Sequence, residues 1–251
     1  MTRIAGGLPL GASDPETGQR YRSDHSLALV SVWAILVAAG RGERLGLDQP
    51  KVFAKLGEDP LLAEPLRRLE ESGWVDAIVL VAPPGWEEPA ILLAEELGCG
   101  KVNACVPGGE TRAESVRAGM AEVPADAVVV LVHDAARPLL TDAVIERVLA
   151  PLSEGWDGAV PGLPVADTLK RVGPDGAIEE TVSRDGLWAV QTPQAFPADV
   201  LRAAVNGGGD ATDCAALVEA RGGRVKVVEG DARLLKVTTA DDLAKIVAWL
   251  Q

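Results

Sequence analysis

The sequence is poor in the side chains that bind zinc or form disulfide frameworks. Among its 251 residues are only two histidines and three cysteines. A zinc site needs a denser cluster of such ligands than this chain offers. The odd number of cysteines, without a Cys-x-x-Cys pair, indicates free thiols in a reducing compartment, so a cytoplasmic protein is expected. The residues concerned are His25, His133, Cys99, Cys105 and Cys214.

With so few histidines, the chain offers little imidazole for acid–base chemistry. His133 stands beside Asp134, and such a pair could exchange protons with a substrate. The favoured interpretation is a structural histidine, hydrogen-bonded at the end of a strand. A Ser-His-Asp arrangement stays open on spacing alone, but the chain lacks the G-x-S-x-G turn that presents a nucleophilic serine in α/β hydrolases.

The chain also lacks a basic excess and a long hydrophobic segment. It carries 24 Lys and Arg residues against 37 Asp and Glu, which gives a formal net charge of −13. That balance argues against nonspecific binding to DNA or RNA, while a local basic pocket for a small phosphorylated substrate stays open. The nearly unbroken apolar run over 27–39 is too short to cross a bilayer. No nucleic-acid or membrane partner is expected.

The N-terminal residues 1–30 are rich in Gly, Pro, Ser, Asp and Arg and show no periodicity. This composition predicts a flexible extension. A secretion signal is disfavoured, because the segment before the apolar run is long and contains Asp14, Glu16 and Asp24. The remaining residues, 31–251, are enough for one large α/β domain or two small ones.

What the chain does have is an apolar strand that ends in a glycine turn. The strand is apolar through Ala39, and Gly40 and Gly42 follow, with Arg44 and Lys51 close behind. Backbone N–H groups in such a turn can face an anion, and the two cations can hold its charge. The spacing fits neither a Walker loop nor a dinucleotide fingerprint. The turn therefore predicts a polyphosphate site, with an ordinary strand-to-helix turn as the alternative.

Apolar strands alternate with segments of helical spacing along the rest of the chain. This alternation predicts right-handed βαβ units in a doubly wound, mostly parallel α/β sheet. Ligands bind beyond the carboxyl ends of such strands, so the glycine turn and the Asp134 segment can face one crevice. The expected strands are 77–82, 102–106, 127–132, 224–228 and a last one over 236–239. The expected helices are 61–72, 86–97, 110–122, 141–152, 197–205, 212–221 and 240–250, the last with Thr239 as its N-cap.

The pattern changes near Gly158. Two strand-like segments, 168–172 and 177–182, flank a Gly-Pro-Asp-Gly turn and predict a β-hairpin. An isolated two-stranded ribbon is marginally stable in water. The hairpin is therefore expected to rest on something, and a partner subunit is a good candidate.

Eight motifs occur in an order that resembles the 2-C-methyl-D-erythritol 4-phosphate cytidylyltransferases of the non-mevalonate isoprenoid pathway. The resemblance covers about residues 33–250, and the ordered set is far more specific than any single motif. The motifs are Ala38-Ala39-Gly40-x-Gly42-x-Arg44 with Lys51, Gly108-Gly109-Glu110-x-Arg112-x-x-Ser115, Val132-His133-Asp134-Ala135-Ala136-Arg137-Pro138, Asp167-Thr168, Thr181-Val182-x-Arg184-x-Gly186-Leu187-Trp188, Thr192-Pro193-Gln194, Thr212-Asp213 and Lys236-Val237-Thr238.

The resemblance implies a Rossmann-like domain over 31–251, with a protruding β-arm at about 163–188 that is used in homodimerisation. It also implies an enzyme that joins CTP and methylerythritol phosphate and releases pyrophosphate, with Mg²⁺ bridging the nucleotide phosphates. No protein residue is assigned as a metal ligand. Asp134 is the nearest candidate carboxylate, but a ribose contact or a structural role is favoured for it. Val37 and Glu110 depart from residues that the family often has, proline and aspartate.

The resemblance also implies the roles of individual residues. Four cations would carry the catalysis: Arg44, Lys51, Arg184 and Lys236. The triphosphate would meet Gly40, Arg44 and Lys51, and the rest of the nucleotide Ala38, Ala39, Gly109, Glu110, Ser115, Asp134 and Ala135. The acceptor would meet Arg137, Thr192, Thr212 and Lys236, with Thr168 and Arg184 supplied by the other subunit's arm.

Other functions stay open. A related cytidylyltransferase for another polyol phosphate, such as ribitol 5-phosphate, would share the nucleotide half. A non-catalytic nucleotide-binding module is disfavoured because the four cations are all present. A nicotinamide-dependent oxidoreductase is disfavoured by the mis-spaced glycines.

Overall fold

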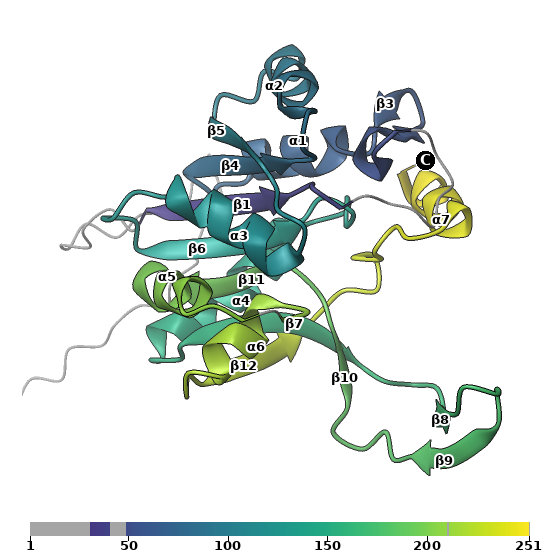
Figure 1. Ribbon diagram of the computed structural model, residues 1–251. Coiled ribbons are helices and arrows are strands. Elements are labelled where there is room, and N and C mark those ends of the chain that lie inside the picture. Colours follow the sequence, from purple (N-terminus) through teal and green to yellow (C-terminus); the bar gives the residue numbers. More distant parts are fainter. Residues whose placement is uncertain (1–30, 41–48, 210, 251) are drawn as a thin grey trace, which may run out of the picture. The chain divides into compact units, whose positions relative to one another are not determined.

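The computed structural model of the chain describes residues 31–40, 49–209 and 211–250 (Figure 1). The extension expected over 1–30 lies outside the described residues, and so do Gly42 and Arg44 of the glycine turn. No helix in the described ranges is long and apolar enough to cross a membrane.

A mixed, mostly parallel sheet forms the centre of the described part of the chain. Its strands follow the order β10-β7-β11-β6-β1-β4-β5, and β12 also pairs with β7. β1 lies between β4 and β6 and is parallel to both, β5 is parallel to β4, and β12 is parallel to β7. β10 and β11 run antiparallel to their neighbours. The bounds are β1 Val32–Val37, β4 Ala77–Ala82, β5 Val102–Pro107, β6 Val129–Asp134, β7 Gly158–Pro164, β10 Trp188–Val190, β11 Gln194–Pro197 and β12 Val225–Glu229.

Helices cover both faces of this sheet, because its central strands are apolar on both sides. Neighbouring residues of β1 show the division: Leu36 packs in one apolar core and Ile35 in the other. The first core includes side chains of α1, α2 and α4, and the second includes side chains of α3, α5 and α6 (Figure 1). The doubly wound α/β fold is confirmed. The helices are α1 Ala63–Glu71, α2 Glu87–Glu96, α3 Arg112–Ala121, α4 Asp142–Ser153, α5 Ala198–Asn206 and α6 Cys214–Glu219.

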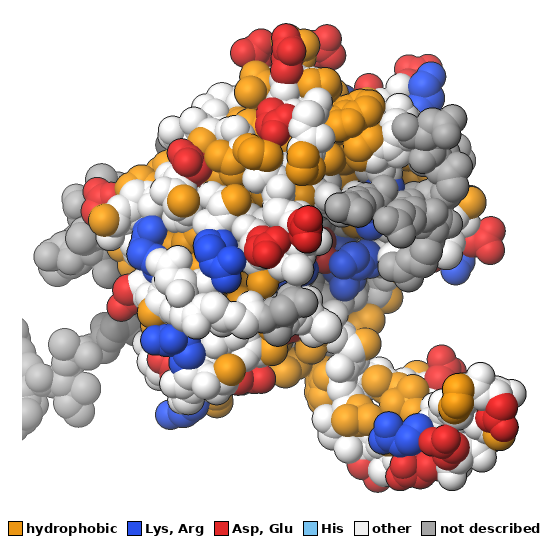
Figure 2. Space-filling model, in the orientation of Figure 1, with side chains coloured by type: hydrophobic (Ala, Val, Ile, Leu, Met, Phe, Trp, Pro, Cys, Tyr) orange, Lys and Arg blue, Asp and Glu red, His pale blue; other side chains and the backbone are white. Residues whose placement is uncertain are grey.

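The expected hairpin is present as a two-stranded arm that extends away from the sheet (Figure 1). It consists of β8, Leu169–Val172, paired antiparallel with β9, Ile178–Val182. Its side chains are mostly exposed, including the apolar Val172 and Ile178, and Figure 2 shows the arm set apart from the body with apolar and charged side chains on its surface. Its use in dimerisation stays a prediction.

The prediction of a last strand over 236–239 is wrong. Residues 236–239 join no sheet in the described structure. The backbone N–H of Val237 donates instead to the carbonyl of Ala136 (2.8 Å), in the loop after β6. The helix that follows, α7 at Ala240–Leu250, is confirmed, and the hydroxyl of Thr239 caps it by accepting the N–H of Asp242.

A small substructure lies beside α7 (Figure 1). It consists of the 3-10 helix η2, Lys51–Phe53, followed by β2, Lys55–Leu56, and β3, Asp59–Pro60, which pair antiparallel. Neither these short strands nor the antiparallel strands β10 and β11 were predicted from sequence patterns.

Candidate active site

The segments that follow β1, β5 and β6 meet at the carboxyl edge of the sheet. β1 and β6 pair in parallel, with Val37 opposite Asp134. Just beyond the strands, three backbone N–H groups donate to backbone carbonyls at 2.8 to 2.9 Å. The donor and acceptor pairs are Ala38 to Val81, Ala135 to Val37, and Gly108 to Ala82. The predicted meeting of the segments after β1 and β6 at one edge is therefore confirmed.

The loop after β5 requires its glycines. A Cβ at Gly108 would collide with the side chain of Ala39, and one at Gly109 would collide with Glu114. The loop is held from below by Ser115, whose buried hydroxyl accepts the N–H of Gly109 (3.1 Å) and donates to the carbonyl of Thr111 (3.0 Å). Ser115 thus positions the loop, while Glu110 is exposed at its surface.

The loop leads directly into α3, which begins at the same edge. Thr111 and Glu114 form a capping box, since the hydroxyl of Thr111 accepts the N–H of Glu114 and the Glu114 carboxylate accepts the N–H of Thr111. The same carboxylate also accepts the N–H of Glu110 (2.8 Å). This cap fixes the direction of Arg112 in the first turn.

Arg112 and Lys236 meet at the carboxylate of Asp134. The Nε of Arg112 donates to Oδ1 (3.1 Å) and the ammonium of Lys236 to Oδ2 (2.7 Å). Burial alone would raise the pKa of Asp134, but the two cations hold it well below its usual value. The cluster therefore stays charged, with one more cation than carboxylate.

This cluster lines a cavity of about 250 Å³ at the carboxyl edge. Three cations and two carboxylates contribute, and the remaining lining is mostly polar. The residues are Arg112, Asp134, Arg137, Val190, Gln191, Thr192, Gln194, Thr212, Asp213 and Lys236.

Arg137 offers an uncommitted donor at this cavity. Its Nη1 donates to the carbonyl of Leu234 (2.6 Å), which fixes the side chain. Its Nε is buried and has no hydrogen-bond partner among the described residues. A buried donor without a partner is rare in folded proteins, so this guanidinium suits an anionic ligand.

His133 and Thr192 form a hydrogen-bonded pair below the cavity. The Thr192 hydroxyl accepts the N–H of Asp134 and contacts Nδ1 of His133, both at 3.0 Å, and Nε2 of His133 contacts the carbonyl of Arg137 (3.0 Å). Burial lowers the pKa of His133 to about 4. The imidazole is therefore neutral and fully bonded, as the structural interpretation predicted.

Lys51 lies against the segment that carries Lys236. Its ammonium donates to the carbonyl of Val237 (3.3 Å), and a Cβ added to the exposed Gly40 would approach its Cε at 3.7 Å. The end of β1, Lys51 and Lys236 are thus neighbours, although 185 positions separate the two lysines (51 and 236).

Two predicted acceptor residues are not brought to the cavity by their own chain. Thr168 and Arg184 are exposed on the arm, before β8 and after β9, and neither lines the cavity. Thr212 is exposed at the rim and does line it. Arg44 lies outside the described residues.

Five lining residues had no role assigned from the sequence: Arg112, Val190, Gln191, Gln194 and Asp213. The Nε2 of Gln194 donates to the carboxylate of Asp213 (2.9 Å), and its Oε1 accepts the N–H of Cys214 (3.0 Å). Asp213 in turn caps α6 by accepting the N–H of Ala216. Arg112, Gln194 and Asp213 lie inside the quoted motifs, and that position was the available signal. Val190 and Gln191 lie outside those motifs and had no such signal.

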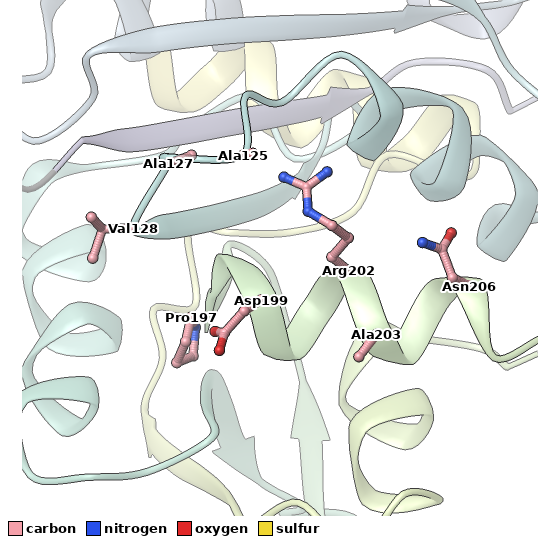
Figure 3. A pocket seen from close by; sticks show the side chains of 8 residues that line it. All are labelled: Ala125, Ala127, Val128, Pro197, Asp199, Arg202, Ala203 and Asn206. Atoms are coloured by element: carbon pink, nitrogen blue, oxygen red, sulfur yellow. The ribbon is translucent and has the colours of Figure 1, made fainter.

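A larger hollow of about 660 Å³ lies near the amino end of β6 (Figure 3). Its lining includes Val128, Asp199 and Arg202. The Arg202 guanidinium is already bound by the carbonyls of Met120, Val123 and Pro124. Its cation is committed to the fold, so this hollow is a poor candidate for a phosphate site.

The carboxylates of the site are also committed. Both oxygens of Asp134 face Arg112 and Lys236, and both oxygens of Asp213 accept hydrogen bonds from Gln194 and Ala216. The described residues contain no group of three or more His, Cys, Asp or Glu that could hold a metal ion. Neither of these two carboxylates is therefore an uncommitted metal ligand.

Together, the doubly wound sheet, the glycine loop after β5 and the cation-lined cavity at the carboxyl edge define an α/β enzyme of the nucleotidyltransferase class. A family model described as IspD, 2-C-methyl-D-erythritol 4-phosphate cytidylyltransferase, matches residues 32–251. The chain belongs to this family.

Individual relatives agree with the family model. The 2-C-methyl-D-erythritol 4-phosphate cytidylyltransferase of Saccharopolyspora erythraea is 47% identical over 219 residues, which cover 86% of this chain and 97% of that protein. The enzyme of that name from Nocardia farcinica is 46% identical over 213 residues, which cover 85% of this chain and 91% of that protein.

Solved structures share the fold. A crystal structure of 4-diphosphocytidyl-2C-methyl-D-erythritol synthase matches with a TM-score of 0.76 and 34% identity, over 88% of this chain and 99% of that one. The 2-C-methyl-D-erythritol 4-phosphate cytidylyltransferase of Thermus thermophilus matches with a TM-score of 0.71 and 33% identity, over 86% of this chain and 97% of that one.

Proposed function

We propose that this protein transfers the cytidylyl group of CTP to 2-C-methyl-D-erythritol 4-phosphate. The products are 4-diphosphocytidyl-2-C-methyl-D-erythritol and pyrophosphate. Besides family membership, the supporting observation is the cluster of Arg112, Asp134 and Lys236 beside Arg137 at the carboxyl edge. Such fixed cations suit two polyanionic reactants that would otherwise repel each other.

CTP lies across the ends of β1 and β5 in this proposal. Gly40, Arg44 and Lys51 hold the triphosphate end. The loop of Gly109 and Glu110, supported by Ser115, holds the base and ribose together with Ala38, Ala39, Asp134 and Ala135. The hydrogen bond from the N–H of Gly109 to the Ser115 hydroxyl supports this placement, because it fixes the loop before a nucleotide arrives.

The acceptor occupies the cavity on the other side of Asp134. Arg137 and Lys236 bind its phosphate, and Thr212 and Thr192 border the polyol. The buried Nε of Arg137 without a partner among the described residues supports an anion there. Thr168 and Arg184 complete the pocket from a second subunit, since their positions on the arm lie outside the cavity of their own chain.

The reaction is an in-line displacement on the α-phosphorus of CTP. A phosphate oxygen of the acceptor forms a bond to that phosphorus, and the bond from it to the oxygen bridging to the β-phosphate breaks. A phosphomonoester has a second pKa near ~6, so the nucleophile is mostly ionised at neutral pH and needs no general base. The neutral, fully bonded His133 agrees with this.

Catalysis then rests on alignment and positive charge. Arg44 and Lys51 stabilise the charge that develops on the α-phosphoryl group and on the leaving pyrophosphate. Lys236 and the partner's Arg184 hold the attacking phosphate in line. Mg²⁺, bound between the nucleotide phosphates, would neutralise part of their charge.

The same proposal includes the organisation of the protein. Residues 31–251 form the catalytic domain, and the arm at about 163–188 joins two chains into a homodimer. The enzyme works in the cytoplasm without a nucleic-acid or membrane partner, and its three free cysteines suit a reducing compartment.

One assay tests the reaction. The purified protein is incubated with Mg²⁺, each of the four nucleoside triphosphates and a panel of polyol phosphates, and pyrophosphate release is measured. Release confined to CTP with methylerythritol phosphate is expected. Faster release with ribitol 5-phosphate would identify the related activity, and nucleotide binding without release under any condition would identify a non-catalytic module.

A further inference from the structure

A third apolar cluster lies outside the two cores that flank the sheet. Its buried members are Leu56, Leu61, Leu139, Val237 and Ile246. None of them belongs to a strand of the large sheet. The cluster instead joins the β2–β3 substructure, the loop after β6, the segment before α7, and α7 itself, which contributes the fully buried Ile246. This separate position means that the cluster holds loops together without supporting the sheet.

The segments that it joins carry the phosphate-binding cations of the proposed site. Val237 directly follows Lys236, and Leu139 lies two positions after Arg137. Leu56 belongs to β2, which comes just after the short helix that begins at Lys51.

Backbone bonds tie these segments to one another. The carbonyl of Val237 accepts the ammonium of Lys51 (3.3 Å), and its N–H donates to the carbonyl of Ala136 (2.8 Å). Val237, with its side chain in the cluster and both backbone groups bonded, is the point where the three segments meet.

Helix α7 is fixed to the segment that carries Lys236 at two places. The carboxylate of Asp242 accepts the N–H groups of Thr238 and Thr239 and the hydroxyl of Thr238, at 2.8 to 3.0 Å. Near the other end of the helix, the guanidinium of Arg233 donates to the carbonyl of Trp249 (3.1 Å). Residues 233–239 are therefore bonded to both ends of the helix, and the side chain of Ile246 lies in the cluster.

We propose that Ile246 of α7 is a positioning residue, which holds Lys51 and Lys236 in the arrangement that binds the two phosphate-bearing substrates. Lysine side chains are long and flexible, so their value in a site depends on how well the surrounding shell restrains them. The cluster restrains the backbone of both lysines at once, and its loss loosens both. The inference rests on the phosphate-binding roles proposed above for these lysines.

The test compares two isoleucines of nearly equal burial. Ile246→Ala removes the side chain from this cluster, and Ile145→Ala removes one from the core beneath α4, where the residue is 1% exposed. Both variants lose stability by creating a cavity. The Kd for CTP with Mg²⁺ is measured by calorimetry and the KM for methylerythritol phosphate by steady-state kinetics, at a temperature well below the lowest Tm.

Ile246→Ala is expected to raise both constants by about twofold to thirtyfold, which is the range for mutations that act without touching the ligand. Ile145→Ala is expected to leave both near the wild-type values. In the Lys51→Ala background, Ile246→Ala should weaken CTP binding no further, because the lysine through which it acts is gone. If Ile246→Ala does not fold, Ile246→Val carries the test, with a smaller change of the same sign.

Three results would overturn the inference. The first is that Ile246→Ala binds both substrates like the wild type while Lys51→Ala binds CTP more weakly. That result would overturn the role of Ile246 and leave the proposed site intact. Another is equal weakening by Ile145→Ala, and a third is independent effects of Lys51→Ala and Ile246→Ala in the double variant. Unchanged CTP binding by Lys51→Ala would overturn the role of that lysine itself, and the inference with it.

Discussion

Asp134 and Lys236 lie 102 positions apart in the sequence and form an ion pair of 2.7 Å at the mouth of the cavity. Arg112 shares the same carboxylate. The pair joins the end of β6 to the segment before α7, so it connects the proposed nucleotide and acceptor sides of the site. The effect of a substitution on CTP binding can therefore be predicted separately from its effect on the acceptor.

Replacement of Lys236 by alanine is expected to impair the acceptor more than the nucleotide. Removal of one electrostatic contact to a reacting phosphate typically costs ~10²-fold or more in rate. Asp134 keeps Arg112 as a partner, so the fold should survive. Steady-state kinetics should show a lower kcat and a higher KM for methylerythritol phosphate, with CTP binding little changed. Unaltered sugar-phosphate kinetics would contradict the assignment.

Asp134 should make folding stability depend on pH in the acid range. Its pKa is below the usual 3.8 in the folded state, so the unfolded chain binds the proton more readily. Its contribution is present above that usual value and is lost as pH falls from about 5 toward the lower folded pKa. The Tm of Asp134→Asn should be lower at pH 7 and should fall less steeply from pH ~6 to ~3. Parallel curves for the two proteins would count against the prediction.

Gly108→Ala should disturb the site through packing. The added Cβ collides with Ala39 and comes within 2.9 Å of the Ser115 hydroxyl, which forces apart the ends of β1 and β5. Overpacking of this kind costs about 1–3 kcal/mol, and CTP binding should weaken as well. Gly73→Ala is the matched control, because its Cβ would meet nothing within 4 Å. Denaturant unfolding and CTP titration measure the two effects, and equal behaviour of both variants would refute the explanation.

The sequence was sufficient for the fold and for the meeting of the segments after β1 and β6 at one edge of the sheet. The apolar runs that became β1, β4 and β6 predicted parallel strands, and the carboxyl ends of such strands share one edge. That reasoning placed Asp134 and Gly40 together. It did not extend to β11, whose four residues are too short to give a period.

The contacts inside the site were beyond prediction from local patterns. Lys236 stands in a segment that forms no strand, so no pairing rule relates it to Asp134 or to Lys51. Gln194 was named only as a member of the motif Thr192-Pro193-Gln194, yet it is buried and fixes Asp213. Both interactions depend on where loops pack after folding, and neither helical nor strand periodicity records that.

The pH dependence of turnover should lack a contribution from His133. Burial lowers the pKa of His133 to about 4, so its imidazole stays neutral throughout the working range. The rate should rise with the second ionisation of the acceptor phosphate, near ~6, and then level off. His133→Asn should lower the Tm but keep the shape of this profile. Loss of the acid limb in that variant would show that the imidazole takes part in proton transfer.

The proposed dimer makes a prediction about mixed subunits. Lys236→Ala disables the site of its own chain, whereas Arg184→Ala disables the site of the partner, because Arg184 lies on the arm outside its own cavity. Each variant alone should be nearly inactive. In a co-expressed mixture, half of the dimers are mixed and each has one intact site, so activity should recover to about a quarter of wild type. The double variant, co-expressed with wild-type chains, checks that subunits exchange at random. If Arg184 served its own chain, no mixture of the two single variants would regain activity, and the arm would have to be assigned another role.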